Sequence, residues 1–162
     1  MTAKIEDFRT EYLNNMAKFI SLELFKERVQ ENDENEVFSM NILRKLGTNN
    51  LLAGPIPQEY GGIGLDPITW GIGCEMIGAA SAAVFTSAAT IQISLIAETI
   101  LVWGNELQRT QYIPYLSNGE KIGCFALTEP NGGSDPSTLE TTATRVNGGW
   151  LINGQKLWIG NG

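Results

Sequence analysis

The sequence predicts an α+β chain, with an all-α N-terminal part followed by the opening strands of a β part. Three observations support this fold class. Nine of the 18 acidic residues lie before residue 37, mixed with apolar residues at helical spacing. Residues 48–108 contain no Lys or Arg, which is typical of buried helices. Short runs rich in β-branched and aromatic residues follow residue 119.

The first predicted element is an amphipathic helix over residues 4–29. A second, shorter helix is predicted over residues 37–46, with Gly47 as its stop. The first helix is predicted because apolar side chains recur at steps of three and four residues, which places them on one face: Ile5, Phe8, Tyr12, Met16 and Phe19.

The middle of the chain predicts three further helices. Asp66 and Pro67 suit the N-cap and first position of a helix over residues 67–83. The second is expected over residues 87–103, and a short third one over residues 106–115. These helices hold few charges, so we expect them to form much of the core.

The residues from 76 to 97 carry no charge over a length of 22 residues, which nominally suffices to cross a membrane. The stretch is built mostly of Ala, Ser, Thr, Gly and Gln, so we expect core helices and no membrane span. Glycines at positions 71, 73 and 78 would each weaken a helix, and we therefore expect them to mark close packing against a neighbour.

The end of the chain predicts strands over residues 121–127, 139–146 and 150–159. Asn147-Gly148-Gly149 separates the last two and is a strong hairpin signal. The order is therefore helices first and strands second.

The composition excludes several classes of function. The chain has no histidine, which excludes Ser-His-Asp and Cys-His nucleophiles and His-rich metal sites. A net charge of −7 without a cluster of basic residues argues against nucleic acid as a partner. Cys74 and Cys124 form no C-x-x-C motif and predict reduced thiols in an intracellular protein, and no targeting signal is visible at the N-terminus.

Residues 124–136 carry the chemistry that the sequence offers. A strand there ends in a Pro-Asn-Gly-Gly turn at 130–133, which leaves backbone N–H groups and the hydroxyls of Thr128 and Ser134 able to face an anion or the edge of a heterocycle. An ordinary strand-to-loop turn explains the same residues. The G-x-G pairs at 62–64 and 71–73 lack a third glycine and a preceding strand, so we expect turn and packing roles for them.

Longer motifs extend this pattern. Leu-Thr-Glu-Pro and Gly-Ser-Asp are followed by Ile-Asn-Gly-Gln-Lys and Trp-Ile-Gly-Asn, and three upstream motifs precede them at residues 57–65, 104–109 and 112–114. In this order they resemble the signature of the acyl-CoA dehydrogenase and acyl-CoA oxidase flavoprotein family. The residues of these motifs are similar to those of the family branch that contains the glutaryl-CoA dehydrogenases and the plant short-chain acyl-CoA oxidases.

The resemblance implies the domain organisation. Residues 1–119 would form the family's N-terminal helical domain, and residues 120–162 would begin its middle β domain, an incomplete, truncated β-barrel-like domain. The implied enzyme is an FAD-dependent dehydrogenase or oxidase that desaturates the α,β bond of an acyl-CoA thioester. Its catalytic glutamate would come from a further helical domain, so we expect no catalytic residue here and no activity from the isolated chain.

The resemblance also implies how FAD and acyl-CoA would be held. Phe125, Leu127 and Thr128 would hydrogen-bond the pyrimidine edge of the isoalloxazine ring. Ser134 would lie near the pyrophosphate and the thioester end of acyl-CoA. Trp158 would form one wall of the site around the ring, a role that suits a flat indole.

Ile159 and Gly160 would present backbone to the N5 and O4 side of the flavin. Many family members have Thr in place of Gly160, whereas the plant oxidases have Gly, so either an electron-transferring flavoprotein or O₂ is expected as electron acceptor. Thr86 and Ser87 would contact substrate where glutaryl-specific enzymes carry Arg-Ser. Without that arginine, we expect a plain short or medium acyl group.

Local carboxylates give no better candidate for the base. Glu75 and Glu98 lie in apolar helices and Glu129 lies in the signature, and none is predicted to be catalytic. The resemblance further implies a homo-oligomer when full length, in the mitochondrial matrix or peroxisome. The alternative is a short, non-catalytic binding or interaction protein derived from this family, which the reading frame beyond Gly162 would distinguish.

Overall fold

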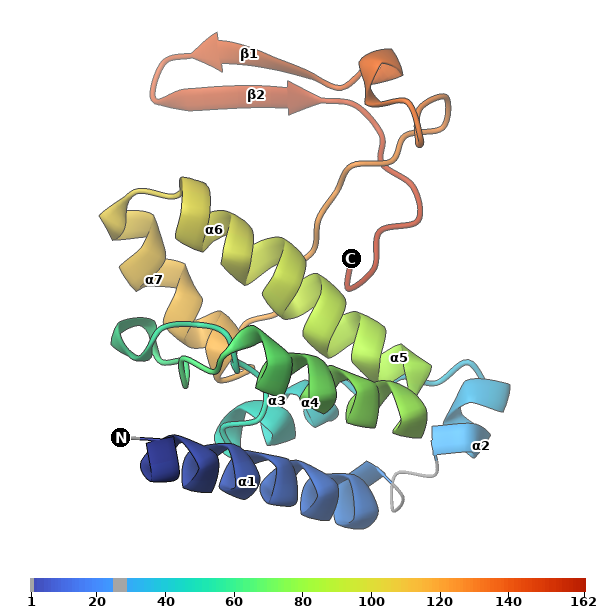
Figure 1. The fold of residues 1–162 in the computed structure, drawn as a ribbon. Helices are drawn as coiled ribbons and strands as arrows, with labels where there is room; N and C mark the ends of the chain where they lie inside the picture. The colour runs from blue at the N-terminus through green and yellow to red at the C-terminus, as the bar shows by residue number, and fades with distance from the viewer. Residues whose placement is uncertain (1, 25–28) are drawn as a thin grey trace. The chain divides into compact units, whose positions relative to one another are not determined.

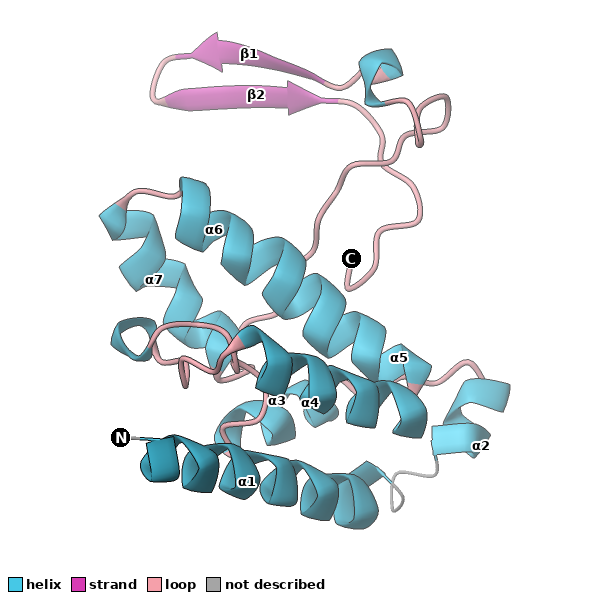
Figure 2. Ribbon diagram, viewed as in Figure 1, coloured by secondary structure: helices cyan, strands magenta, loops and turns pink. Residues whose placement is uncertain are grey.

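The computed structural model describes residues 2–24 and 29–162 (Figure 1). The chain divides into two compact units, Met1–Gly123 and Cys124–Gly162. The first unit is helical and the second holds the strands, as Figure 2 shows. The α+β class, with helices before strands, is thereby confirmed.

Helix α1 (Thr2–Phe19) opens the first unit and turns a face with Tyr12, Met16 and Phe19 into the core. It continues as a wider π-helical turn over Ile20–Leu24. The predicted helix over 4–29 is confirmed as far as residue 24, and positions 25–28 lie outside the described residues. A separate helix, α2, follows at Val29–Glu34.

Helix α3 (Asn41–Thr48) begins later than the predicted residue 37. Glu36 has a φ of 56°, a left-handed conformation that no helix continues through. Gly47, the predicted stop, lies inside the helix instead. A Cβ atom there would overlap the backbone carbonyl of Asn118, so the glycine allows α3 to approach the end of another helix closely.

A 3₁₀ turn at Gln58–Tyr60 precedes helix α4 (Pro67–Ala80). The predicted cap is confirmed, because Asp66 Oδ1 accepts hydrogen bonds from the backbone N–H of Ile68 at 3.2 Å and Thr69 at 3.3 Å. Arg9 Nε lies 2.9 Å from the other carboxylate oxygen of Asp66, which ties α1 to the start of α4.

The glycines of α4 differ from one another. A Cβ at Gly73 would lie 3.1 Å from the Tyr12 ring, which confirms close packing there, and one at Gly78 would make an ordinary contact with Phe85. Gly71 is exposed, and a Cβ added there would meet nothing within 4 Å, so the packing prediction is wrong at that glycine.

One long helix follows, composed of α5 (Ala82–Val84), a π-helical stretch (Phe85–Ala97) and α6 (Glu98–Trp103). In Figure 1 these form a continuous rod. By length and apolar composition Ala82–Trp103 could cross a membrane, yet core helices pass the same test, and 33% of its most apolar window is buried. This is therefore weak evidence for a membrane span.

Gln92 lies fully buried in that long helix and hydrogen-bonds to three backbone groups. Its Nε2 donates to the carbonyls of Leu116 at 3.0 Å and Lys121 at 2.7 Å, and its Oε1 accepts from Gly123 N at 2.9 Å. The side chain thus fixes the end of helix α7 (Glu106–Ser117) and the residues that close the first unit.

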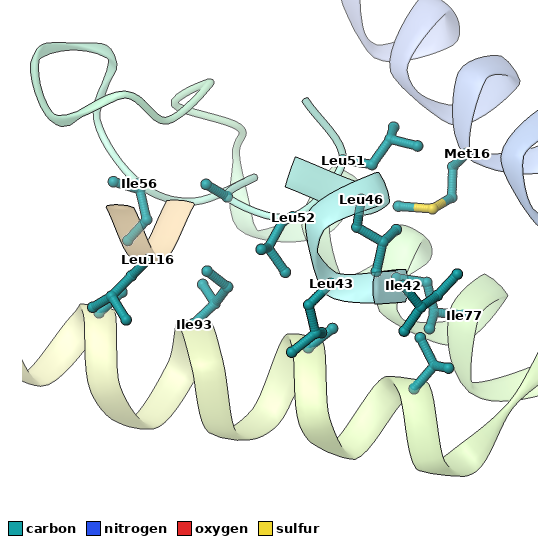
Figure 3. Close-up of a cluster of buried hydrophobic side chains, with 14 of the residues drawn as sticks. Met16, Ile42, Leu43, Leu46, Leu51, Leu52, Ile56, Ile77, Ile93 and Leu116 are labelled. Atoms are coloured by element: carbon teal, nitrogen blue, oxygen red, sulfur yellow. The ribbon is translucent and has the colours of Figure 1, made fainter. Parts of the chain in front are cut away.

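The apolar core gathers side chains from separate segments of the first unit (Figure 3). Each is nearly or completely buried. Leu43 and Leu46 come from α3, and Ile77 from α4. The others labelled there are Met16, Ile42, Leu51, Leu52, Ile56, Ile93 and Leu116.

The second unit holds a 3₁₀ turn at Pro136–Thr138 and the antiparallel strands β1 (Thr142–Val146) and β2 (Gly149–Asn153). Val146 pairs with Gly149, so the predicted hairpin is confirmed, with Gly148 at a φ of 82° in the turn. The strand predicted over 121–127 is wrong. That segment is extended but irregular, because no strand of the described chain lies beside it to complete a ladder.

Candidate functional site

The extended segment after Gly123 presents unpaired backbone donors. Among the residues that the structure describes, none accepts a hydrogen bond from the N–H groups of Phe125, Leu127 or Thr128. The carbonyls of Leu127 and Thr128 are in contrast occupied, by Lys156 Nζ and Leu157 N, each at 2.9 Å. The segment therefore offers free backbone donors, which acceptor atoms on the edge of a heterocycle could use.

The turn after this segment encloses a buried carboxylate. Glu129 is 5% exposed. Its backbone pairs with Gly132 in both directions, with N–H to O distances of 2.7 and 3.2 Å, so the predicted turn is tight. Its Oε2 accepts from Glu140 N at 2.6 Å, and its Oε1 accepts from Thr141 N at 3.0 Å.

Lys156 completes the surroundings of this carboxylate. Its Nζ lies 2.7 Å from Glu129 Oε1. The lysine, together with the backbone donors of Glu140 and Thr141, lowers the pKa of Glu129 to about 2. A carboxyl that is so weakly basic cannot serve well as a general base at neutral pH, which favours a structural role for Glu129.

Trp158 follows Leu157, whose N–H donates to the carbonyl of Thr128. Its φ is 57°, a left-handed conformation that is unusual for a bulky residue, and its side chain is 91% exposed. Such backbone strain gathers at functional positions. The exposed indole offers a flat apolar face for a planar ring.

The remaining predicted residues of the second unit lie close to these segments in sequence. Ile159 is half-buried and Gly160 is exposed, and the carbonyl of Ile159 accepts from Gly162 N at 3.1 Å. Ser134 is exposed, and it precedes Asp135, which caps the 3₁₀ turn by accepting from Ser137 N at 2.9 Å. The structure thus places Phe125, Leu127, Thr128, Ser134, Trp158, Ile159 and Gly160 in one unit.

Thr86 and Ser87 belong to the first unit, at the start of the π-helical stretch. Thr86 is exposed and Ser87 is half-buried. A cavity of about 1140 Å³ lies in the first unit, and neither Thr86 nor Ser87 is among its described lining residues. Its described lining is mainly apolar and includes Ile20, Leu24, Val37, Phe38 and Ile42.

Two residues central to this arrangement received no binding role from the sequence. Glu129 and Lys156 lie inside the signature motifs, and the structure joins them although 27 positions separate them. Their opposite charges beside the two predicted contact segments were the available signal. Within residues 2–24 and 29–162, no cluster of three or more His, Cys, Asp or Glu side chains could hold a metal.

Comparison with known proteins identifies the family. Residues 7–120 match "Acyl-CoA dehydrogenase, N-terminal domain" and residues 124–162 match "Acyl-CoA dehydrogenase, middle domain". An acyl-CoA dehydrogenase of Bacillus subtilis is 40% identical over 130 residues, which cover 80% of this chain and 34% of that protein. The human mitochondrial short-chain specific acyl-CoA dehydrogenase is 38% identical over 151 residues, 92% of this chain and 36% of that protein.

A solved structure gives the same result. Glutaryl-CoA dehydrogenase from Mycobacterium smegmatis, in complex with FADH₂, superposes with a TM-score of 0.85 at 28% identity over 93% of this chain and 38% of that one. The chain thus spans about a third of the length of the curated relatives it matches. Because the two domain matches cover nearly all of the sequence in the order of its motifs, this chain belongs to the acyl-CoA dehydrogenase family.

Proposed function

We propose that this chain is the N-terminal portion of an FAD-dependent acyl-CoA dehydrogenase or oxidase, which desaturates the α,β bond of an acyl-CoA thioester. In this proposal residues 1–119 are the helical domain and residues 120–162 begin the middle β domain. The fold class and the family membership support it.

The observation that carries the proposal is that the N–H groups of Phe125, Leu127 and Thr128 are free of acceptors among the described residues. The pyrimidine edge of an isoalloxazine ring has acceptor atoms that such donors would bind. Trp158 offers an exposed indole face in the same unit, so a planar ring could bind by stacking and by hydrogen bonds to backbone. The residues present therefore fit FAD.

FAD, when bound, supplies the capacity to accept a hydride, and the protein supplies position and electrostatics. Thr128 would add its hydroxyl, which hydrogen-bonds to no described residue. Ser134 would lie toward the pyrophosphate and the thioester. Ile159 and Gly160 would offer backbone N–H groups to the far side of the ring.

The substrate proposal rests on the absence of charge at Thr86 and Ser87. A second carboxylate on the acyl chain would need a cationic partner there, so we infer an uncharged short or medium acyl group. The proposed electron acceptor is an electron-transferring flavoprotein or O₂, and the full-length protein is proposed to be a homo-oligomer. Relatives include both mitochondrial and bacterial proteins, and the proposed location is the mitochondrial matrix or the peroxisome.

The long helix Ala82–Trp103 is proposed to be a core helix and not a membrane span. Gln92 at its middle is completely buried and makes three hydrogen bonds to backbone groups of the same unit. Buried amides are stable where such partners exist, as in a packed protein core.

The test uses the purified 162-residue chain, supplied with FAD, a short-chain acyl-CoA and an electron-accepting dye. We expect a colourless protein after gel filtration. The contacts of one short segment and one indole are too few to retain FAD during the run. We also expect no dye reduction, because Glu129 is a poor base and no catalytic base is assigned in this chain. A yellow preparation that turns over acyl-CoA would contradict the proposal.

A further inference from the structure

We propose that Glu129 and Lys156 are positioning residues, which hold the segments 127–128 and 156–158 side by side so that both can contact the flavin. This inference rests on the proposed function, and it assigns neither residue to contact with the cofactor. It comes from the geometry of their ion pair and from how the second unit is built.

The Glu129 carboxylate ties together three segments that are distant in sequence. Its Oε1 accepts from Lys156 Nζ at 2.7 Å and from the backbone N–H of Thr141 at 3.0 Å, and its Oε2 accepts from the backbone N–H of Glu140 at 2.6 Å. The carboxylate side chain is 3% exposed and that of the lysine is 24% exposed. Solvent therefore screens this pair far less than it screens an ordinary surface pair.

Lys156 extends the connection to the segment with the free donors. Its Nζ also donates to the carbonyl of Leu127 at 2.9 Å. The next residue, Leu157, donates its N–H to the carbonyl of Thr128 at 2.9 Å. These two bonds hold the carbonyls of Leu127 and Thr128 and leave their N–H groups unpaired among the described residues, while Trp158 follows Leu157 immediately in the chain.

Apolar packing does not explain this arrangement. Every buried apolar side chain in the part of the chain that the structure describes lies in the first unit. In the second unit the buried residues among those described are Glu129 and Gly132, and both strands of the hairpin are exposed along their whole length. Within the described residues of the second unit, the contacts of Glu129 and Lys156 are therefore what connects these segments.

The test compares Glu129→Gln, Lys156→Met and Lys156→Arg in the 162-residue chain, with Lys45→Met as the control. Lys45 pairs with Glu23 at 3.2 Å in the first unit, where both side chains are about a third exposed, so the control removes a more exposed ion pair elsewhere. Two quantities are measured: hydrogen exchange of the Leu157 amide, and the affinity for free FAD from quenching of flavin fluorescence. Exchange across β1 and β2 reports whether the second unit stays folded.

We expect Glu129→Gln and Lys156→Met to accelerate exchange at Leu157 by about tenfold with the hairpin still protected. They should also weaken FAD affinity by about tenfold, as expected when one charge-assisted contact is lost. Lys156→Arg keeps the charge and should retain most of the protection at Leu157 and most of the FAD affinity. Lys45→Met should change neither the exchange rate at Leu157 nor the FAD affinity.

Failure of the positioning role and failure of the proposed function give different results. If Leu157 exchange or FAD affinity is the same in Glu129→Gln as in the unaltered chain, which does bind FAD, the positioning role is wrong and the proposed function stands. If the unaltered chain shows no FAD binding in this titration, the proposed flavin site is wrong, and the positioning role is overturned with it. If Lys156→Arg is as impaired as Lys156→Met, charge is not what holds the segments.

Discussion

At the scale of single residues, two buried polar side chains organise this protein. Gln92 makes three hydrogen bonds in the first unit, and Glu129 makes an ion pair and two backbone hydrogen bonds in the second. Each one hydrogen-bonds to backbone groups of an irregular segment. Those groups have no partner within a helix or a β-sheet. A buried polar group that is fully paired specifies one arrangement, because every alternative leaves a donor or acceptor unpaired.

Gln92→Leu tests this role in the first unit. Leucine has a similar volume but can make none of the three hydrogen bonds of the buried Gln92 amide, so we expect a loss of about 2 kcal/mol in the free energy of unfolding. Chemical denaturation followed by circular dichroism measures it. Ser94→Ala is a suitable control, since its hydroxyl bonds only within the helix, to Ala89 O at 2.8 Å. Equal stability of the leucine variant and the control would refute the role.

At the scale of elements, local sequence patterns predicted most of the helices and the hairpin. The cap at Asp66 and the Asn147-Gly148 turn are local signals, and the structure has both. Two of the differences share a physical cause. The strand predicted over 121–127 needed a partner strand, which no local pattern can supply, and the π-helical winding of Phe85–Ala97 depends on packing around it.

The same limit applies to the candidate site. The motifs identified the segments that hold the predicted flavin contacts, because those signatures are read directly along the chain. The pairing of Glu129 with Lys156 joins residues 27 positions apart, and only the folded backbone brings them together. The local pattern therefore gave the residues that are proposed to face a ligand, but not those that hold them in place.

Helix α4 gives a test at the scale of elements. Gly71 and Gly73 are two positions apart in the same helix, and both should favour alanine by intrinsic propensity. Gly71→Ala has open space and should stabilise the chain by roughly 0.5–1 kcal/mol. Gly73→Ala would place its methyl 3.1 Å from the Tyr12 ring and should be less stable than Gly71→Ala. Thermal unfolding compares them, and equal gains would show that α1 and α4 are not closely packed there.

At the scale of the whole molecule, the two units differ in what stabilises them. The first has the apolar core, and the second has a buried carboxylate, a hairpin and exposed apolar side chains such as Trp150, Leu151 and Ile152. Both match domains of one enzyme family in the expected order. The central claim is that the second unit presents a flavin-binding edge made of residues 125–128 and Trp158.

The four tryptophans allow that claim to be tested directly. Trp158 is 91% exposed and Trp103, in the first unit, is 85% exposed, so both are equally open to unspecific stacking. The measurement is the movement of the ¹⁵N-labelled indole resonances during titration with FAD, assigned with Trp158→Phe and Trp103→Phe. We expect the Trp158 resonance and the Thr128 amide to shift and saturate together while Trp103 stays unmoved. Equal shifts at Trp103 and Trp158, or no shift at Trp158, would contradict the claim.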